Sequence, residues 1–139
     1  MEKILIAYFT TTGNTQSIAE AFNDAIKDSA EVTLVEMSDD LSIEGFDKYM
    51  FGSPAQGTEV TDDTVFDPFM EKNIEGLKNK KVALFGSFGW GGGEYMTTFA
   101  DKIKADGVNV FDAPFTVLEA PDQEAIDAAM EYANKFLSF

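Results

Sequence analysis

The residues best suited to chemistry form one short segment, Thr10–Thr15, which reads Thr-Thr-Thr-Gly-Asn-Thr. An apolar run at 4–9 precedes it and a helical pattern follows from Ser17. Backbone N–H groups at a helix start lack partners and attract anions, and the hydroxyls and the amide add neutral donors. We therefore predict a phosphate cradle, with a hydroxyl-capped helix start as the alternative. Its candidate residues are Thr10, Thr11, Thr12, Gly13, Asn14 and Thr15.

Two familiar phosphate-binding loops do not fit this segment. The nucleoside-triphosphate loop needs a lysine where Asn14 stands, and the dinucleotide fingerprint needs three glycines where only Gly13 is present. No lysine or arginine lies between Lys3 and Lys27. A phosphate here would be held by dipoles and hydrogen bonds, without a cation nearby in the sequence.

The composition narrows the class of protein. A chain of 139 residues with 45% hydrophobic content predicts a single globular domain over 1–139. There is no cysteine and no histidine, which excludes thiol nucleophiles, disulfides, zinc–thiolate sites and imidazole bases. No signal peptide or membrane-spanning run is present, so we expect a cytoplasmic protein that does not bind a membrane.

The charge is strongly acidic, with 25 acidic and 10 basic residues and a net charge of −15. Nucleic acid is thereby excluded as a ligand, because its phosphates need a basic surface. Such a surface favours basic protein partners. The alternative, that the acidity serves solubility alone, stays open.

Strand and helix patterns alternate along the chain. Strands are predicted at 4–9, 31–36, 48–53 and 80–87, with a last, interrupted strand at 109–111 and 115–118. Helices are predicted at 13–27, 65–74, 94–104 and 122–137; the second should begin late, because Pro68 is tolerated only in a first turn. This alternation predicts a parallel sheet covered on both faces. Ligands of such sheets bind at the carboxyl ends of the strands, which selects the loops after strands one, three and four.

The other two loops have the composition of a site for a flat aromatic ligand. Trp90 is the only tryptophan, and it lies between Gly89 and Gly91. We predict that it stacks on a planar ligand, with a local hydrophobic plug as the alternative. Residues 56–59 read as a four-residue turn with Gly57 at a position that demands positive φ. Glu59 could accept an N–H from a ligand, although composition alone favours a solvated carboxylate.

These segments together resemble the short-chain flavodoxins, small FMN-binding electron carriers. The resemblance covers nearly the whole chain and is carried by three motifs: Thr-x-Thr-Gly-Asn-Thr at 10–15, Gly57 with Glu59 after strand three, and Gly-Ser-Phe-Gly-Trp-Gly at 86–91. It implies a flavodoxin-like three-layer α/β sandwich with a five-stranded parallel sheet in the order 2-1-3-4-5. It also implies FMN bound at the switch between strands one and three.

The resemblance further implies a role for each loop. Thr10, Thr12, Asn14 and Thr15 would hold the phosphate, and Trp90 would stack on one flavin face. The Gly57 carbonyl would accept flavin N5–H after one electron and one proton are added, and the Glu59 carboxylate would accept N3–H. The complete implied cofactor site consists of Thr10, Thr11, Thr12, Gly13, Asn14, Thr15, Pro54, Ala55, Gln56, Gly57, Thr58, Glu59, Ser87, Phe88, Gly89, Trp90 and Gly91.

The implied function is low-potential transfer of single electrons through the FMN semiquinone/hydroquinone couple, between redox enzymes with basic docking surfaces. The protein would be a monomer without substrate turnover of its own. Because none of the three loops contains a lysine, negative charge on the flavin should be disfavoured, which suits a strong reductant.

The sequence departs from the family pattern at two places in the site. Gln56 stands where related proteins often carry a bulky apolar residue over the second flavin face, and Thr58 stands where Asp, Asn or Gly is more familiar. The segment 119–121 resembles the last ligand-side loop only loosely and is assigned no role.

Three other classes of protein compete with an electron carrier. A quinone or NAD(P)H reductase of the same fold would need a second substrate site, and we expect the chain to be too short for one and to lack a basic nucleotide clamp. A signalling receiver domain would need acids after strand one, which ends in Tyr8-Phe9. A low-molecular-weight phosphatase is excluded by the absent cysteine.

Overall fold

The computed structural model describes all residues 1–139 and is built on a parallel sheet. The strands run in the order β2-β1-β3-β4-β5, and β6 also pairs with β4 in parallel. The predicted order is therefore confirmed, with the fifth position shared by two short strands, as the interrupted pattern indicated. The strands are β1 (Lys3–Tyr8), β2 (Glu31–Glu36), β3 (Lys48–Gly52), β4 (Lys81–Phe88), β5 (Asn109–Val110) and β6 (Phe115–Leu118).

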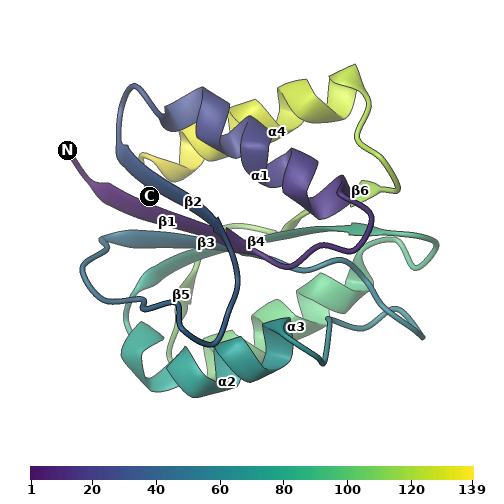
Figure 1. The fold of residues 1–139 in the computed structure, drawn as a ribbon, viewed down its shortest axis with the longest axis horizontal. Coiled ribbons are helices and arrows are strands. Elements are labelled where there is room, and N and C mark those ends of the chain that lie inside the picture. The colour runs from purple at the N-terminus through teal and green to yellow at the C-terminus, as the bar shows by residue number, and fades with distance from the viewer.

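Four helices cover the sheet, and Figure 1 shows α1 and α4 on one face with α2 and α3 on the other. This is the three-layer sandwich expected from the alternating pattern. None of the helices combines the length and the apolar character needed to cross a membrane. The helices are α1 (Asn14–Ile26), α2 (Phe66–Leu77), α3 (Glu94–Ala105) and α4 (Gln123–Phe136).

The start of α2 shows how local sequence sets a boundary. The helix begins at Phe66, so Pro68 lies in its first turn, where a missing N–H costs nothing. Asp62 caps this start: its carboxylate accepts the backbone N–H of Val65 at 2.7 Å and of Phe66 at 2.9 Å. The late helix start predicted from Pro68 is confirmed.

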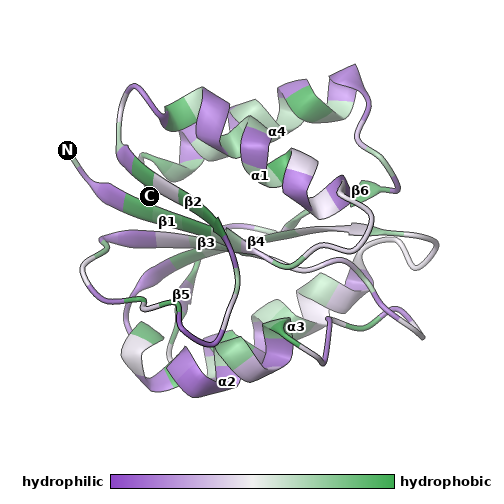
Figure 2. Cartoon of the chain, in the orientation of Figure 1, coloured by the Kyte–Doolittle hydropathy of each residue, from purple (hydrophilic) through white to green (hydrophobic).

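Two hydrophobic cores lie on opposite faces of the sheet, because successive strand side chains point to opposite sides. On β1, Ile4 and Ile6 pack with α1 and α4, whereas Leu5 and Ala7 pack with α2 and α3. Figure 2 shows the same division, with apolar central strands between helices whose outer sides are polar. Burial on both faces makes the sheet a rigid platform for the loops at its ends.

A buried lysine anchors the amino end of this platform to the last helix. The Lys48 side chain is 2% exposed, and its Nζ donates to Phe136 O at 3.1 Å and Leu137 O at 2.8 Å. Its charge is balanced by Glu2 at 3.1 Å. The last carbonyls of a helix lack intrahelical partners and attract cations, so Lys48 satisfies the end of α4.

Candidate functional site

Three loops leave the adjacent strands β1, β3 and β4 at the same edge of the sheet, because the carboxyl ends of parallel strands meet there. Backbone hydrogen bonds tie these loops to one another. Phe9 N donates to Gly52 O at 3.0 Å, and Ala55 N donates to Ser87 O at 2.8 Å. The three segments selected from the sequence therefore form one continuous surface.

The loop after β1 ends in an uncapped helix start. Gly13 precedes α1 with φ 89°, a left-handed conformation that favours glycine, and no side chain caps the helix. Its N–H donates to Thr10 Oγ1 at 3.1 Å, and its carbonyl accepts the Ser17 N–H at 3.0 Å. Thr11 and Thr12 are exposed beside this helix start. The hydroxyl-cap alternative is thus wrong for this helix start, which keeps the N–H groups of its first turn for an anion.

Thr15 differs from the other threonines of this loop because its side chain is completely buried. Its Oγ1 lies 3.2 Å from Ser87 Oγ, which follows from its place in the first turn of α1 facing the sheet. The structure thereby joins two predicted site residues from different loops. The Thr15 hydroxyl is thus engaged inside the protein, whereas Thr11 and Thr12 are exposed to a ligand.

The turn after β3 is one residue longer than predicted. Gln56 and Val60 exchange both backbone hydrogen bonds, at 2.7 and 3.0 Å, so the closing pair is 56–60 and not 56–59. The positive φ predicted for Gly57 is confirmed at 53°. Glu59 also adopts a positive φ, of 59°, which composition could not indicate because this conformation is uncommon outside glycine. This second left-handed residue accounts for the extra length.

The Glu59 carboxylate links the loops after β3 and β4. Its two oxygens accept the backbone N–H of Gly89 at 3.1 Å and of Gly91 at 2.8 Å. A Cβ at position 91 would lie 2.8 Å from Glu59 Oε1, so glycine lets the two loops approach. The solvated carboxylate favoured by composition is therefore wrong.

Trp90 lies on the outside of the loop after β4, with 71% of its surface exposed. The alternative of a local hydrophobic plug is wrong, because the ring is not packed into the protein. Two further apolar side chains are exposed in this region, Val60 at 52% and Leu118 at 56%. Exposed apolar side chains that gather at one edge mark a surface that binds a ligand or a partner.

A tyrosine that sequence reasoning left unassigned lies beneath these loops. Tyr95, the second residue of α3, is 6% exposed, and its hydroxyl donates to Ser53 O at 2.7 Å. Burial raises the pKa of this hydroxyl, and the negative charge of Glu59 raises it further, so it stays protonated. Nothing in the sequence could name its partner, which lies 42 positions away.

The loops at the carboxyl ends of the strands carry acidic residues and no lysine. None of the ten lysines falls in the segments that leave the carboxyl ends of the strands, which are 9–15, 37–47, 53–65, 89–93 and 111–122. Acidic residues do occur there, including Glu59, Asp62 and Asp112. The lysines lie instead on strand starts and toward the later turns of helices, as with Lys48, Lys81 and Lys104. The molecule is therefore electrically polarised along its strands.

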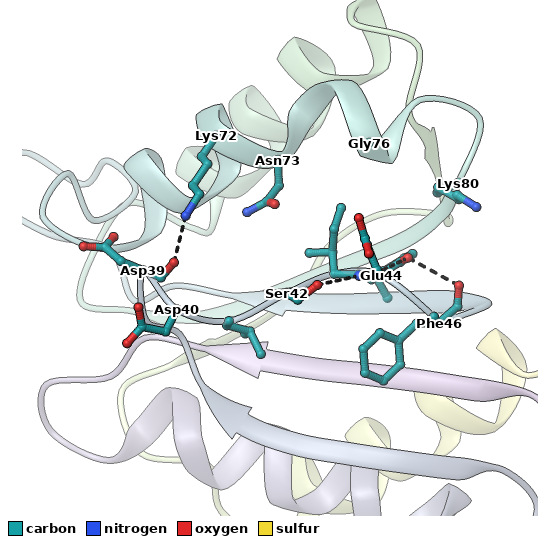
Figure 3. Close-up of a pocket in the computed structure, with 13 residues that line it drawn as sticks. Asp39, Asp40, Ser42, Glu44, Phe46, Lys72, Asn73, Gly76 and Lys80 are labelled. Atoms are coloured by element: carbon teal, nitrogen blue, oxygen red, sulfur yellow. Dashed lines mark hydrogen bonds between the residues drawn. The ribbon is translucent and has the colours of Figure 1, made fainter.

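The largest pocket is separate from this edge. It has a volume of about 550 Å³ and lies between the segment 39–46 and α2, as Figure 3 shows. Lys72 reaches across it and donates to Asp39 O at 2.8 Å. None of its lining residues belongs to the three loops. The loops instead form an open surface, which suits a flat ligand that the protein contacts along the ligand's edge and on its faces.

The order of the strands places these loops at the switch between β1 and β3, where the doubly wound α/β proteins that bind mononucleotides hold their ligands. Residues 6–132 match the family model described as Flavodoxin. The chain belongs to the flavodoxin family, and it is an electron-transfer protein that uses FMN.

Individual relatives agree with this assignment. The chain is 36% identical to a flavodoxin of Clostridium beijerinckii, with 94% of this chain and 96% of the relative covered. It is 37% identical to a flavodoxin of Megasphaera elsdenii, with 84% and 87% covered. The solved structure of a flavodoxin from the domain Archaea superposes with a TM-score of 0.88 over 98% of this chain and 96% of the other, at 22% identity, which supports the fold.

Proposed function

We propose that this chain is a low-potential carrier that moves single electrons between redox enzymes and turns over no substrate of its own. The observation that carries the proposal is that the three loops contain acidic residues and no lysine. Bound FMN supplies the redox chemistry, since it can take up electrons one at a time. What the protein contributes is an electrostatic field that resists further negative charge at the site. This resistance lowers the potential at which the last electron enters.

Two features of the structure fit FMN at this edge. The uncapped start of α1 offers backbone N–H groups beside the exposed Thr11 and Thr12, which suits a phosphate. Trp90 offers an exposed aromatic face on which a flavin ring can stack. Because the three loops are hydrogen-bonded to one another, one molecule can reach both features.

We assign roles to the loops on this basis. Residues 10–15 would hold the phosphate through backbone N–H groups and the hydroxyls of the outer threonines. Trp90 would cover one face of the ring, and residues 54–59 together with 87–91 would hold its edges. The Gly57 carbonyl would accept a hydrogen bond from the N–H that the ring gains with the first electron. Gln56, which is half-buried at the base of its turn, would offer a polar amide to the second face.

The role of Glu59 changes in the light of its contacts. Each carboxylate oxygen already accepts one backbone N–H from the loop after β4. A carboxylate oxygen has two lone pairs, so Glu59 can brace this loop and also accept the flavin N3–H. We therefore propose a double role, with the brace present before any ligand binds.

The partner proteins follow from the charge distribution. A partner with a basic surface would be steered toward the lysine-free edge, where the exposed Trp90 and Leu118 lie. Electron transfer needs only close approach of the two redox centres, so a small, transient contact suffices. The proposal retains the monomeric state and the cytoplasmic location expected from the sequence.

A spectrum of the purified protein tests this function. The expected result is visible flavin absorption at one FMN per chain, stepwise one-electron reduction with dithionite, and no NAD(P)H consumption with added quinones. A reductase of the same fold would consume NAD(P)H with FMN bound. Such turnover would show that the protein is an enzyme and not a carrier. Apoprotein without affinity for FMN would overturn both the carrier and the reductase.

A further inference from the structure

One hydroxyl beneath the site contacts the ends of two loop-bearing strands. Tyr95 Oη lies 2.7 Å from Ser53 O, to which it donates, and 3.3 Å from Ser87 O. Ser53 is the last residue before the loop at 54–59, and Ser87 is the residue from which the loop at 88–93 leaves. The Tyr95 hydroxyl therefore spans the two points where these loops begin.

The packing at this point leaves no room for adjustment. A Cβ built on Gly86 would overlap both the Ser53 carbonyl oxygen and the Tyr95 hydroxyl. Tyr95 is the second residue of α3, and its ring packs in the hydrophobic core between the sheet and helices α2 and α3. The hydroxyl thus transmits the position of a rigid helix to both loops.

We propose that Tyr95 is a positioning residue whose hydroxyl holds the bases of the 54–59 and 88–93 loops against α3, and thereby sets the affinity for FMN and its first one-electron potential. This inference rests on the proposed function, because it assigns both loops to the flavin ring. Glu59 joins the two loops at the surface, and Tyr95 joins their bases to α3. Backbone hydrogen bonds from Ser53 N to Phe85 O at 3.1 Å and from Ala55 N to Ser87 O at 2.8 Å join the two strand ends to each other. Without the hydroxyl, this joined pair of strand ends can shift relative to α3.

The chain contains a matched control for the loss of a buried tyrosine hydroxyl. Tyr49 is 2% exposed, and its hydroxyl donates to Ile43 O at 2.7 Å and approaches Phe46 O at 3.3 Å. These contacts have the same chemistry and the same lengths as those of Tyr95. They lie, however, at the segment between β2 and β3, which contains no residue of the three loops.

The experiment compares Tyr95→Phe with Tyr49→Phe. For each variant and the wild type, we would measure the denaturant midpoint of the apoprotein, the Kd for FMN by flavin fluorescence, and both one-electron potentials. We expect similar losses of stability in the two variants, because each removes a 2.7 Å hydrogen bond to a buried carbonyl. Only Tyr95→Phe should raise the Kd, by about tenfold, on the scale of one lost buried hydrogen bond. Only Tyr95→Phe should lower the first potential.

The outcomes separate this inference from the proposed function. Wild-type apoprotein that does not bind FMN overturns the function itself. Wild type that binds FMN, with Tyr95→Phe and Tyr49→Phe equal in Kd and potentials, overturns the positioning role alone. If Tyr95→Phe apoprotein is too unstable to handle, all three proteins are measured in sucrose, which favours the compact state without occupying a phosphate site.

Discussion

Gly91 donates its backbone N–H to Glu59 at 2.8 Å, across a sequence separation of 32 residues. With the second bond from Gly89 at 3.1 Å, this carboxylate holds together two of the three loops of the candidate site. A residue expected to meet either solvent or a ligand thus has a structural partner on the protein. Its substitution should change both the loop and the potential.

Glu59→Gln should weaken FMN binding by about tenfold, because the amide has one acceptor oxygen in place of two and its NH₂ group opposes a backbone N–H. Removal of a negative charge at the site should also make the second one-electron potential less negative. Glu94→Gln is the matched control, since it removes an exposed charge at the start of α3 whose carboxylate makes no hydrogen bond to the loop. Fluorescence titration and potentiometry measure both effects. A second potential that becomes more negative in Glu59→Gln contradicts the assignment.

Trp90 should report FMN binding directly, because it is the only tryptophan and 71% exposed. Apoprotein emission should be that of a solvated indole and should fall strongly when FMN is added. Trp90→Ala should weaken binding by roughly 0.5–1.5 kcal/mol beyond the loss of area, and Trp90→Phe should restore part of it. Unquenched emission at saturating FMN would remove Trp90 from the site.

Gly57→Ala should lower the first one-electron potential. The turn that presents the Gly57 carbonyl holds this residue at φ 53°, which alanine resists by roughly 1–2 kcal/mol. If that carbonyl accepts a hydrogen bond from the N–H that the ring gains with the first electron, the strain weighs on the reduced state, and its cost corresponds to a fall of roughly 40–90 mV.

Gly45→Ala is the control for Gly57→Ala. Gly45 has φ 89°, and an added Cβ would meet no atom within 4 Å at either position. The two variants therefore impose backbone strain without a clash, one inside the site and one outside it. Equal first potentials in the two variants, with FMN bound, would show that the Gly57 peptide does not respond to reduction.

Electron transfer should depend on salt with a sign set by the charge of the partner. The lysine-free edge should speed reaction with a cationic acceptor such as hexaammineruthenium(III), and salt should slow it by screening. Ferricyanide, an anionic acceptor, should react faster as salt rises. Stopped-flow rates between low and physiological ionic strength test this. If the rates with both acceptors are independent of salt, the acidic surface serves solubility and does not steer partners.

Asp62→Ala should destabilise the fold by about 1 kcal/mol near neutral pH, because it removes the cap of α2. Burial raises the pKa of Asp62, but hydrogen bonds from Phe66, Thr64 and Val65 outweigh it, so the net pKa is lowered. The contribution is complete above the unfolded pKa of about 3.9 and is lost as pH falls through the lower folded pKa.

Denaturant unfolding of wild type and Asp62→Ala between pH 2 and 7 measures this contribution. The difference should be constant at higher pH and should shrink at the acid end. Asp63→Ala, at the exposed neighbouring carboxylate, should cost much less. A stability difference that grows as pH falls would mean that the charged form of Asp62 is not the capping form.

The sequence by itself determined the order of elements, their types and the loops that meet at the site. Periodicity located the strands and the interruption before Phe115, and Pro68 indicated the late start of α2. Each of these features depends on residues close in the chain. The residue types alone placed Gly13 at a helix start and gave Gly57 a positive φ. Family resemblance then supplied FMN and the strand order.

Only the tertiary structure decided which side chains meet across the loops. Thr15 with Ser87, Glu59 with Gly91 and Tyr95 with Ser53 are contacts over 72, 32 and 42 residues. Such partners follow from the register of β1, β3 and β4, which places chain segments side by side without any local signal. The turn at 56–60 was misjudged by one residue for the same reason, since Glu59 takes its left-handed conformation while bonded to another loop.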